Sequence, residues 1–167
     1  MMTKKRDRER ILCIDPGTRE MGIAVLEDTE LIYYGVRTLK KKRPASVLLR
    51  ETRRIISRLI DDYGIKRLII EKTFFNRNKN VSNLIVMADE IKALAKKRKL
   101  KVTEYAPKTV RKSICQDGKA TKREVSKVIS ARYPELNIYL TQDRKWKVKY
   151  WQNCFDAIAL GLCYLSE

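Results

Sequence analysis

The chain has 167 residues, with 38 Lys and Arg against 20 Asp and Glu, a formal net charge of +18 and 44% hydrophobic residues. This charge predicts an acidic partner, best met by nucleic acid, while the hydrophobic content excludes a disordered basic tail and suits one buried core. Its apolar runs are far shorter than the roughly 20 residues that cross a bilayer, and residues 1–10 resemble no secretory or transit segment. We therefore expect a cytoplasmic protein without a membrane span.

Histidine is absent from the sequence, and the four cysteines are widely separated, with no C-x-x-C pair. These facts give no support to zinc-finger or disulfide scaffolds, and the absence of histidine excludes every nucleophile system or general base that depends on it. Any catalysis is therefore expected to rest on carboxylates and metal ions.

The first part of the chain predicts three strands that are close enough in sequence to form an antiparallel meander, at residues 10–15, 21–27 and 31–39. Residues 44–63 repeat apolar side chains at helical spacing and are followed by Gly64, a typical helix stop. A buried strand follows at 66–71. Because a strand, a helix and a strand form a crossover, this fourth strand should lie parallel to another strand.

The second part repeats the pattern, with a helix at 80–98 and a short strand at 101–105. Three further helices are predicted, one with Pro107 in its first turn and one opened by the capping box Thr121-x-x-Glu124; they cover residues 107–115, 121–133 and about 150–165. This order predicts an α/β fold with a mixed five-stranded sheet flanked by helices. We expect a single domain over residues 1–167, with a flexible basic N-terminus at 1–9.

Two of the predicted strands end in an acid, Asp15 and Glu71. If these strands are parallel neighbours, they lie about 4.8 Å apart and both acids reach the same edge of the sheet. A third acid, Asp156, lies in an otherwise apolar helix, where an unpaired charge is costly to bury. One or two Mg²⁺ or Mn²⁺ ions would provide the partner and serve phosphodiester chemistry. Taken singly, each acid could instead be a turn residue, a solvent-facing acid or an ion-pair partner.

Several motifs together resemble the RuvC family of Holliday-junction endonucleases, in order and spacing over nearly the whole chain. They are Ile14-Asp15-Pro16-Gly17-Thr18 with Gly22, Ile70-Glu71 with Phe74 and Asn78, Glu104-Tyr105-Ala106-Pro107, Gly118-Lys119-Ala120-Thr121-Lys122, and Asp156-Ala157-Ile158-Ala159. The first is shared with actin-like proteins and YqgF-type nucleases; the E-Y-A-P segment and the later basic loop are more specific. The resemblance implies an RNase H-like sheet of order 3-2-1-4-5. It also implies a homodimer that cuts two strands of a four-way DNA junction symmetrically with Mg²⁺ or Mn²⁺, in recombination and repair.

By position, the resemblance makes Asp15, Glu71 and Asp156 the catalytic, metal-binding carboxylates. Asn153 departs from the family, which usually has Asp or His three residues before the last Asp. Its amide oxygen could still bind the metal, but it brings no charge and cannot act as a base. Asp143 is the nearest upstream acid that could supply the missing charge. Phe74 matches an aromatic residue that stacks on a base near the junction centre; alternatively, it is a partly buried aromatic at a strand end.

Basic residues offer candidate DNA contacts. Lys119, Lys122 and Arg123 surround the predicted helix start at Thr121, whose free N–H groups favour phosphate. Arg111 and Lys122 also fall at positions that the family uses for DNA. Basic runs at 96–101 and 144–149 are typical of solvated faces, and we favour Arg111 and Lys122 over the 96–101 run.

Other functions fit parts of the pattern. A YqgF-type nuclease acting on other structured nucleic acid would share the fold, but the E-Y-A-P segment speaks against it. A non-catalytic junction-binding protein would agree with Asn153 and with the net charge of +18. An actin-like ATPase would need a second domain. A branch-migration motor is a conceivable partner of a junction nuclease.

Overall fold

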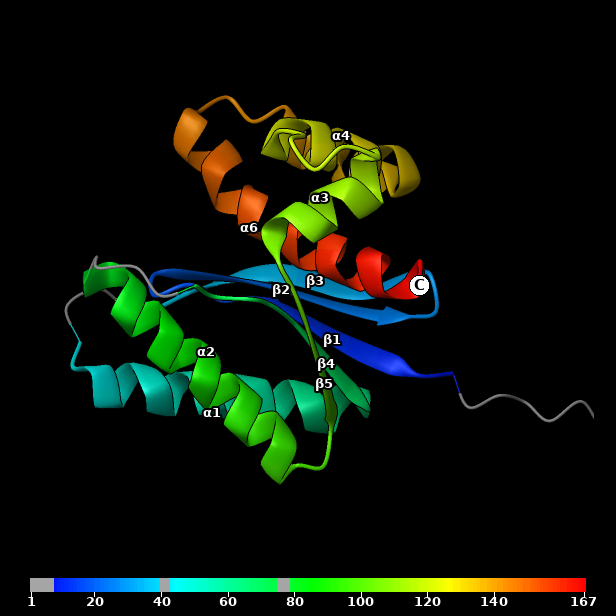
Figure 1. Ribbon diagram of the computed structural model, residues 1–167. Coiled ribbons are helices and arrows are strands. Elements are labelled where there is room, and N and C mark those ends of the chain that lie inside the picture. Colours follow the sequence, from blue (N-terminus) through cyan, green and yellow to red (C-terminus); the bar gives the residue numbers. More distant parts are fainter. Residues whose placement is uncertain (1–7, 40–42, 75–78) are drawn as a thin grey trace, which may run out of the picture.

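The computed structural model describes residues 8–39, 43–74 and 79–167, in which one five-stranded sheet is covered by helices on both faces (Figure 1). Its strands are β1 (Arg10–Asp15), β2 (Glu20–Glu27), β3 (Glu30–Thr38), β4 (Arg67–Glu71) and β5 (Lys101–Tyr105). The order is β3-β2-β1-β4-β5, with β1 to β3 antiparallel and with β4 and β5 parallel to β1. The predicted mixed sheet, meander and parallel crossovers are confirmed.

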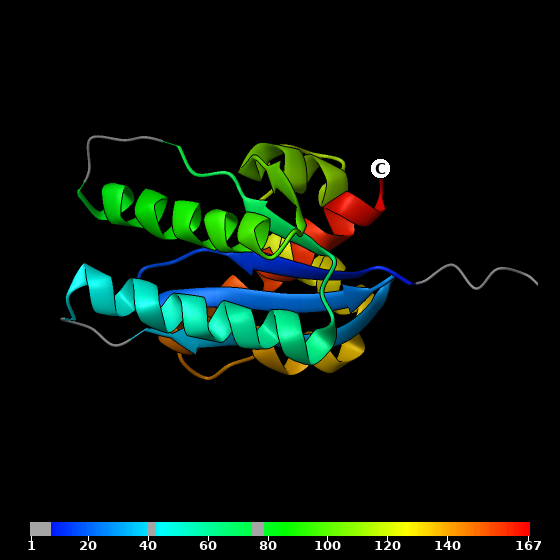
Figure 2. The same cartoon turned by 90° about the horizontal axis from the view of Figure 1, so that it is seen from below.

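The helices form two layers. Helices α1 and α2 cover one face, where Figure 2 shows them running along the sheet, and the later helices cover the other. The helices are α1 (Ala45–Tyr63), α2 (Lys79–Lys97), α3 (Pro107–Cys115), α4 (Lys122–Arg132), the 3₁₀ turn η1 (Pro134–Leu136), α5 (Asn137–Leu140) and α6 (Lys145–Leu165). None of the helices in the described ranges is long and apolar enough to cross a membrane.

Local signals set several helix ends as expected. Gly64 ends α1 in the left-handed conformation, with φ 60°, and Pro107 lies in the first turn of α3. At the start of α4, Thr121 Oγ1 accepts from the backbone N–H of Glu124 at 3.2 Å, and the Glu124 carboxylate accepts from the N–H of Thr121 at 2.5 Å. The predicted capping box is therefore confirmed.

The prediction was wrong about the start of the last helix and missed the turn before it. Helix α6 begins at Lys145, about one turn before the predicted start, so most of the basic run 144–149 is helical. Trp146 and Val148 alternate with lysines in this extra turn, so it lacks the helical spacing of apolar residues, and Lys147 pairs with Asp143 at its start at 2.8 Å. Both η1 and α5 were unpredicted, since they are too short for periodicity to reveal.

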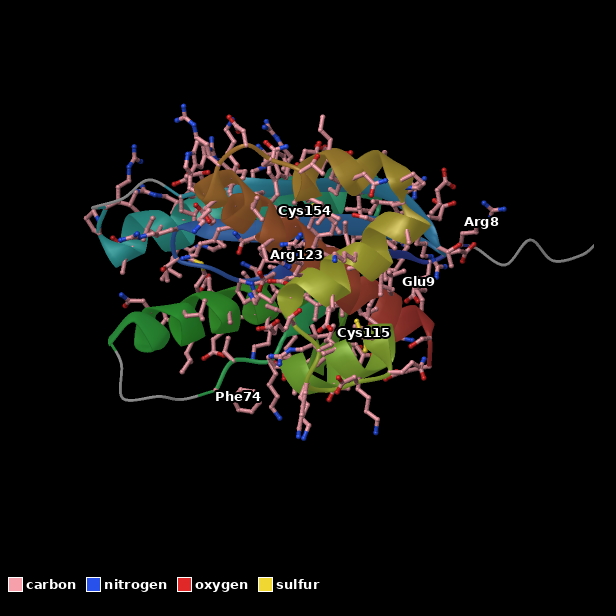
Figure 3. The ribbon with its side chains drawn as sticks, turned by 90° about the horizontal axis from the view of Figure 1, so that it is seen from above. Arg8, Glu9, Phe74, Cys115, Arg123 and Cys154 are labelled. Carbon is pink, nitrogen blue, oxygen red and sulfur yellow. The ribbon has the colours of Figure 1, made fainter. Side chains whose placement is uncertain are left out.

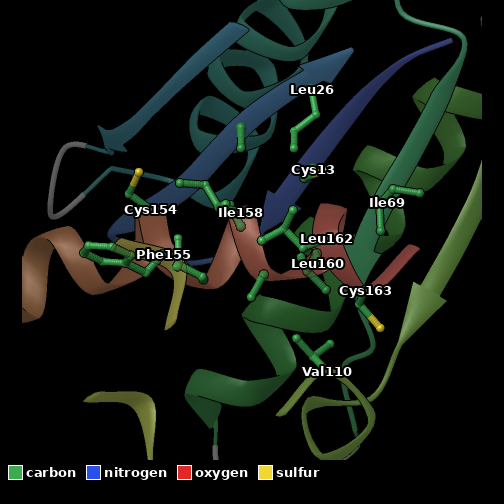
Figure 4. Close-up of a cluster of buried hydrophobic side chains, with 14 of the residues drawn as sticks. Cys13, Leu26, Ile69, Val110, Cys154, Phe155, Ile158, Leu160, Leu162 and Cys163 are labelled. Carbon is green, nitrogen blue, oxygen red and sulfur yellow. The ribbon is translucent and has the colours of Figure 1, made fainter. Parts of the chain in front are cut away.

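The alternation of side chains along each strand divides the core in two. In β1, Cys13 packs toward α6, while Leu12 and Ile14 pack toward α1 and α2. The core on the α6 side, shown in Figure 4, also contains Leu26, Ile69, Val110, Phe155, Ile158 and Leu162. The same alternation decides the face on which polar residues at the strand ends emerge.

Candidate active site

Two carboxylates leave the sheet side by side on the face that α6 covers. Strands β1 and β4 are parallel and in register, so Asp15 and Glu71 lie at the same edge. Cys13 and Ile69, two residues earlier in each strand, belong to the core on the α6 side. Since strand residues two apart share a face, Asp15 and Glu71 are directed toward α6.

The third carboxylate, Asp156, comes from α6 and is held by two donors. Lys122 Nζ lies 2.9 Å from its Oδ2, and Gln152 Nε2 donates to its Oδ1 at 3.0 Å. Gln152 in turn accepts a hydrogen bond from the hydroxyl of the buried Ser126 at 3.0 Å. The orientation of Asp156 is therefore set by groups from both α4 and α6.

The three carboxylates are close enough to repel one another. Burial, followed by the charges of Asp156 and Glu71, raises the pKa of Asp15 well above its usual range. Burial and Asp156 also raise the pKa of Glu71, against the opposing effects of Lys122 and Arg111. Burial lowers the pKa of Lys122, but attraction to Asp156, Asp15 and Glu71 outweighs it and the net pKa rises. Lys122 is thus the shared counter-ion of the three acids.

A pocket of about 130 Å³ lies where α3, α4, α6 and the end of β4 meet. Charged groups form part of its lining, namely Glu71, Arg111, Lys122 and Asp156, and Pro107, Val110, Val125 and Ala159 form the apolar part. Carboxylates and cations therefore face the same small volume, an arrangement that could bind a phosphate together with a divalent cation.

The donor set suits a hard divalent cation. Oxygen ligands from carboxylates are the ones that Mg²⁺ and similar ions prefer, and three acids carry more charge than Lys122 alone neutralises. Within residues 8–39, 43–74 and 79–167, no three acidic or thiol side chains are arranged so that they could hold a metal ion as they stand. Instead the Lys122 ammonium contacts Asp156. The residues present therefore fit the ion in chemistry and net charge.

A glycine lets α6 approach the sheet at this point. A Cβ at Gly22 would lie 1.8 Å from the backbone oxygen of Asn153, so any larger residue would push the helix away. Gly22 pairs with Asp15 across the β1–β2 register. The close approach of α6 is therefore made directly beside the first carboxylate.

The side-chain nitrogen of Asn153 donates two hydrogen bonds to other groups of the protein. Nδ2 donates to Glu20 Oε2 at 3.1 Å and to the backbone oxygen of Tyr150 at 3.0 Å. Asp143, by contrast, accepts from Lys147 at 2.8 Å. The acid beside Asn153 is therefore Glu20, whereas Asp143, the nearest upstream acid in sequence, pairs with Lys147.

The predicted basic residues are not equally placed. Arg111 and Lys122 line the pocket, and Arg123 lines a wider groove that begins at Lys122. Lys119 lies exposed in the turn before α4, with its backbone N–H donating to Asp117 Oδ1 at 2.8 Å. Figure 3 shows Arg123 near the middle of the face formed by α4 and α6.

Phe74 follows β4 and is 57% exposed. Figure 3 shows its ring at the margin of the molecule, and Lys72 Nζ lies 5.9 Å from the ring centroid. This exposure argues against a partly buried strand-end aromatic and leaves the ring accessible; stacking on a base stays a prediction. Asn78, which also carried the resemblance, lies outside the described residues.

Sequence reasoning missed three residues that shape the site, namely Gln152, Ser126 and Glu20. Gln152 precedes Asp156 by four positions, a helical spacing that could have revealed the contact. Glu20 lies 133 positions from Asn153, so only the folded chain brings the two together.

The sheet order, with helices on both faces, defines the RNase H-like fold class. Two solved structures share the fold. Thermus thermophilus RuvC aligns with a TM-score of 0.74 and 18% identity, over 94% of this chain and 93% of that chain. The yeast mitochondrial Holliday junction resolvase Ydc2 aligns with a TM-score of 0.70 and 14% identity, over 95% of this chain and 78% of that chain.

Sequence comparison gives the family. Residues 11–164 match the family model described as crossover junction endodeoxyribonuclease RuvC. The RuvC of Bacteroides fragilis is 32% identical over 162 residues, covering 94% of this chain and 82% of that protein. The RuvC of Prochlorococcus marinus subsp. pastoris is 29% identical over 162 residues, covering 95% and 97%. The chain belongs to the RuvC family, whose members are divalent-metal-dependent nucleases.

Proposed function

We propose that this protein is an endonuclease that resolves four-way DNA junctions by paired symmetric nicks during recombination and repair. The observation that carries the proposal is the convergence of Asp15, Glu71 and Asp156 around Lys122, beside a pocket that also holds Arg111. Membership of the RuvC family supports it, as does the shared fold of Thermus thermophilus RuvC, one structure of which is a complex with a Holliday junction substrate (TM-score 0.73, 17% identity).

The three carboxylates would hold the divalent cation. When bound, such an ion stabilises charge on the attacking and leaving oxygens of a phosphodiester. Arg111 and Lys122 would bind the phosphate beside it, and Gln152 would keep the Asp156 carboxylate oriented toward the pocket. Because Asn153 adds no charge, we propose that Mn²⁺ supports activity better than Mg²⁺.

Symmetric nicking of a four-way junction calls for two copies of the site, so we propose a homodimer, with residues 1–167 of each copy as one nuclease domain. A branch-migration motor would deliver junctions to it. The cytoplasm is the proposed location, as the compartment in which bacterial relatives such as that of Bacteroides fragilis would meet DNA.

A labelled four-way junction tests this function directly. With Mg²⁺ or Mn²⁺ we expect paired nicks at symmetric positions; with chelator, binding without nicking; and with a linear duplex of the same sequence, far less cutting. Binding without cutting under all metal conditions would instead favour a non-catalytic junction-binding protein. Preferred cutting of RNA or of other branched nucleic acids would favour a YqgF-type nuclease.

A further inference from the structure

A second and larger hollow adjoins the active-site pocket. This groove, with a volume of about 690 Å³, runs between the first turn of α4 and the first half of α6. Lys122 lines both the pocket and the groove, so the two adjoin at this side chain. Its other cations are Arg123, Lys145 and Lys149. We call it the α6 groove.

The cations of the α6 groove outnumber its acids. Glu20 is the one carboxylate in its lining, and it already accepts a hydrogen bond from Asn153. Lys145 and Lys149 are exposed, and in the part of the chain that the structure describes no carboxylate lies within ion-pair distance of either. Lys147, which does not line the groove, is by contrast paired with Asp143 at 2.8 Å.

The spacing along α6 connects these lysines with the active site. Lys145, Lys149, Asn153 and Asp156 follow one another at four, four and three positions, so they form a stripe along one side of the helix. At a rise of about 1.5 Å per residue, the stripe spans about 16 Å. Phosphates of one strand in a duplex are spaced about 3.4 Å apart along the axis, so several of them would fit along it.

We propose that the α6 groove holds the phosphate backbone of the DNA strand that enters the active site, with Lys145 and Lys149 as contacts. The inference rests on the proposed function and adds the path of the strand. Arg111 belongs to the pocket but not to the α6 groove, whereas Lys145 and Lys149 belong only to the groove. The strand therefore meets Arg111 on one side of the cut phosphate and the two lysines on the other.

The competing view is that residues 145–149 are only a solvated helix face. Two variants separate the alternatives, Lys145→Gln/Lys149→Gln and the control Lys96→Gln/Lys97→Gln, which removes two exposed charges from the end of α2. Both should fold, because glutamine and lysine have similar helix propensities. Circular dichroism and thermal unfolding verify this.

Junction binding is measured across a range of salt concentrations. For Lys145→Gln/Lys149→Gln we expect the slope of log K against log salt to flatten by about 1.8, since each lost phosphate contact removes about 0.9. The control should leave the slope unchanged. A slope equal to wild type for Lys145→Gln/Lys149→Gln would overturn the proposal.

Uncharged methylphosphonate linkages locate the contact. Neutral linkages on one side of the cut phosphate should weaken wild-type binding but cause no further loss in Lys145→Gln/Lys149→Gln, since the same contact cannot be lost twice. Additive losses on both sides would overturn the proposed path. If the wild-type protein neither binds nor cuts the junction, the proposed function itself fails. If it does both and only these effects are missing, the groove assignment alone is wrong.

Discussion

The side-chain amide of Asn153 donates a hydrogen bond to the Glu20 carboxylate at 3.1 Å and so joins the start of β2 to α6, three residues before Asp156. The contact is possible because alternation along β2 directs Glu20 and Gly22 to the same face as Ala24, which packs in the core on the α6 side. A neutral residue at 153 can donate to Glu20, whereas an aspartate there would repel it. The contact with Glu20 therefore gives a structural reason for a neutral hydrogen-bond donor at position 153.

Asn153→Asp should strengthen metal binding and weaken the metal-free protein. The new carboxylate adds negative charge beside Asp156 but replaces a hydrogen bond to Glu20 with repulsion between like charges. We expect tighter Mn²⁺ binding by calorimetry, a lower Mg²⁺ concentration for half-maximal cutting, and a lower midpoint of thermal unfolding in chelator. The double variant Glu20→Gln/Asn153→Asp should recover the thermal midpoint. Superimposable metal titrations for wild type and Asn153→Asp would contradict this account.

The stability of the metal-free protein should fall as pH rises. Burial and the neighbouring acids raise the pKa of Asp15 in the folded protein, so the folded state binds its proton more tightly than the unfolded chain, where the value is about 3.8. This stabilisation is complete below the unfolded pKa and is lost as pH rises through the folded pKa. Asp15→Asn removes the charge, so we expect its thermal midpoint in chelator to exceed that of wild type at about pH 8, by about 3 °C. The gap should narrow in acid. Equal midpoints at every pH would show that burial and the neighbouring acids do not raise the pKa of Asp15 in the folded protein.

Gly22→Ala should separate α6 from the sheet. The added methyl group would lie 1.8 Å from the Asn153 backbone oxygen, and such overpacking typically costs about 1–3 kcal/mol. The cutting rate should fall by more than the loss of folded protein explains, because the displaced helix carries Asp156. Gly35→Ala is a suitable control, since its Cβ would first meet the Tyr33 hydroxyl oxygen at 3.4 Å. Denaturant unfolding and junction cutting measure the two effects, and equal behaviour of both variants would count against the close approach at Gly22.

Arg111→Ala should flatten the dependence of junction binding on salt by about one unit, as expected for one lost phosphate contact. Lys122→Ala should do the same and also lower the cutting rate, because Asp156 loses its 2.9 Å partner. Lys101→Ala, from the basic run at the start of β5, is the matched control and should leave the slope unchanged. If only Lys101→Ala changes the slope, the DNA path lies along that run instead.

Patterns with strong local causes could be predicted from sequence. The ends of α1 and α4 follow from Gly64 and from the Thr121 capping box, and the parallel pairing of β1 with β4 follows from the crossover rule. The extra first turn of α6 could not be predicted, since Trp146 and Val148 alternate with lysines there and show no helical spacing of apolar residues.

The candidate site was predictable to a similar degree. Asp15 and Glu71 could be paired because both end predicted neighbouring strands, and Asp156 could be added because a lone charge in an apolar helix needs a partner, an assignment that the family resemblance supports. The Lys122 contact with Asp156 and the Glu20 contact with Asn153 join segments 34 and 133 positions apart, which no local pattern specifies. The acids at the strand ends can thus be predicted from sequence, but the long-range contacts made by Lys122 and Glu20 cannot.

In the proposed mechanism, three carboxylates cut the junction while basic residues bind it. The most direct measurement compares nicking and binding of a labelled four-way junction by Asp15→Asn, Glu71→Gln and Asp156→Asn, with Asp143→Asn as a control acid that is exposed and paired with Lys147. We predict that nicking by the first three variants falls at least about a thousandfold, because the three acids act as one unit, while binding is kept and the control cuts like wild type. Cutting at the wild-type rate by any of the three would contradict it.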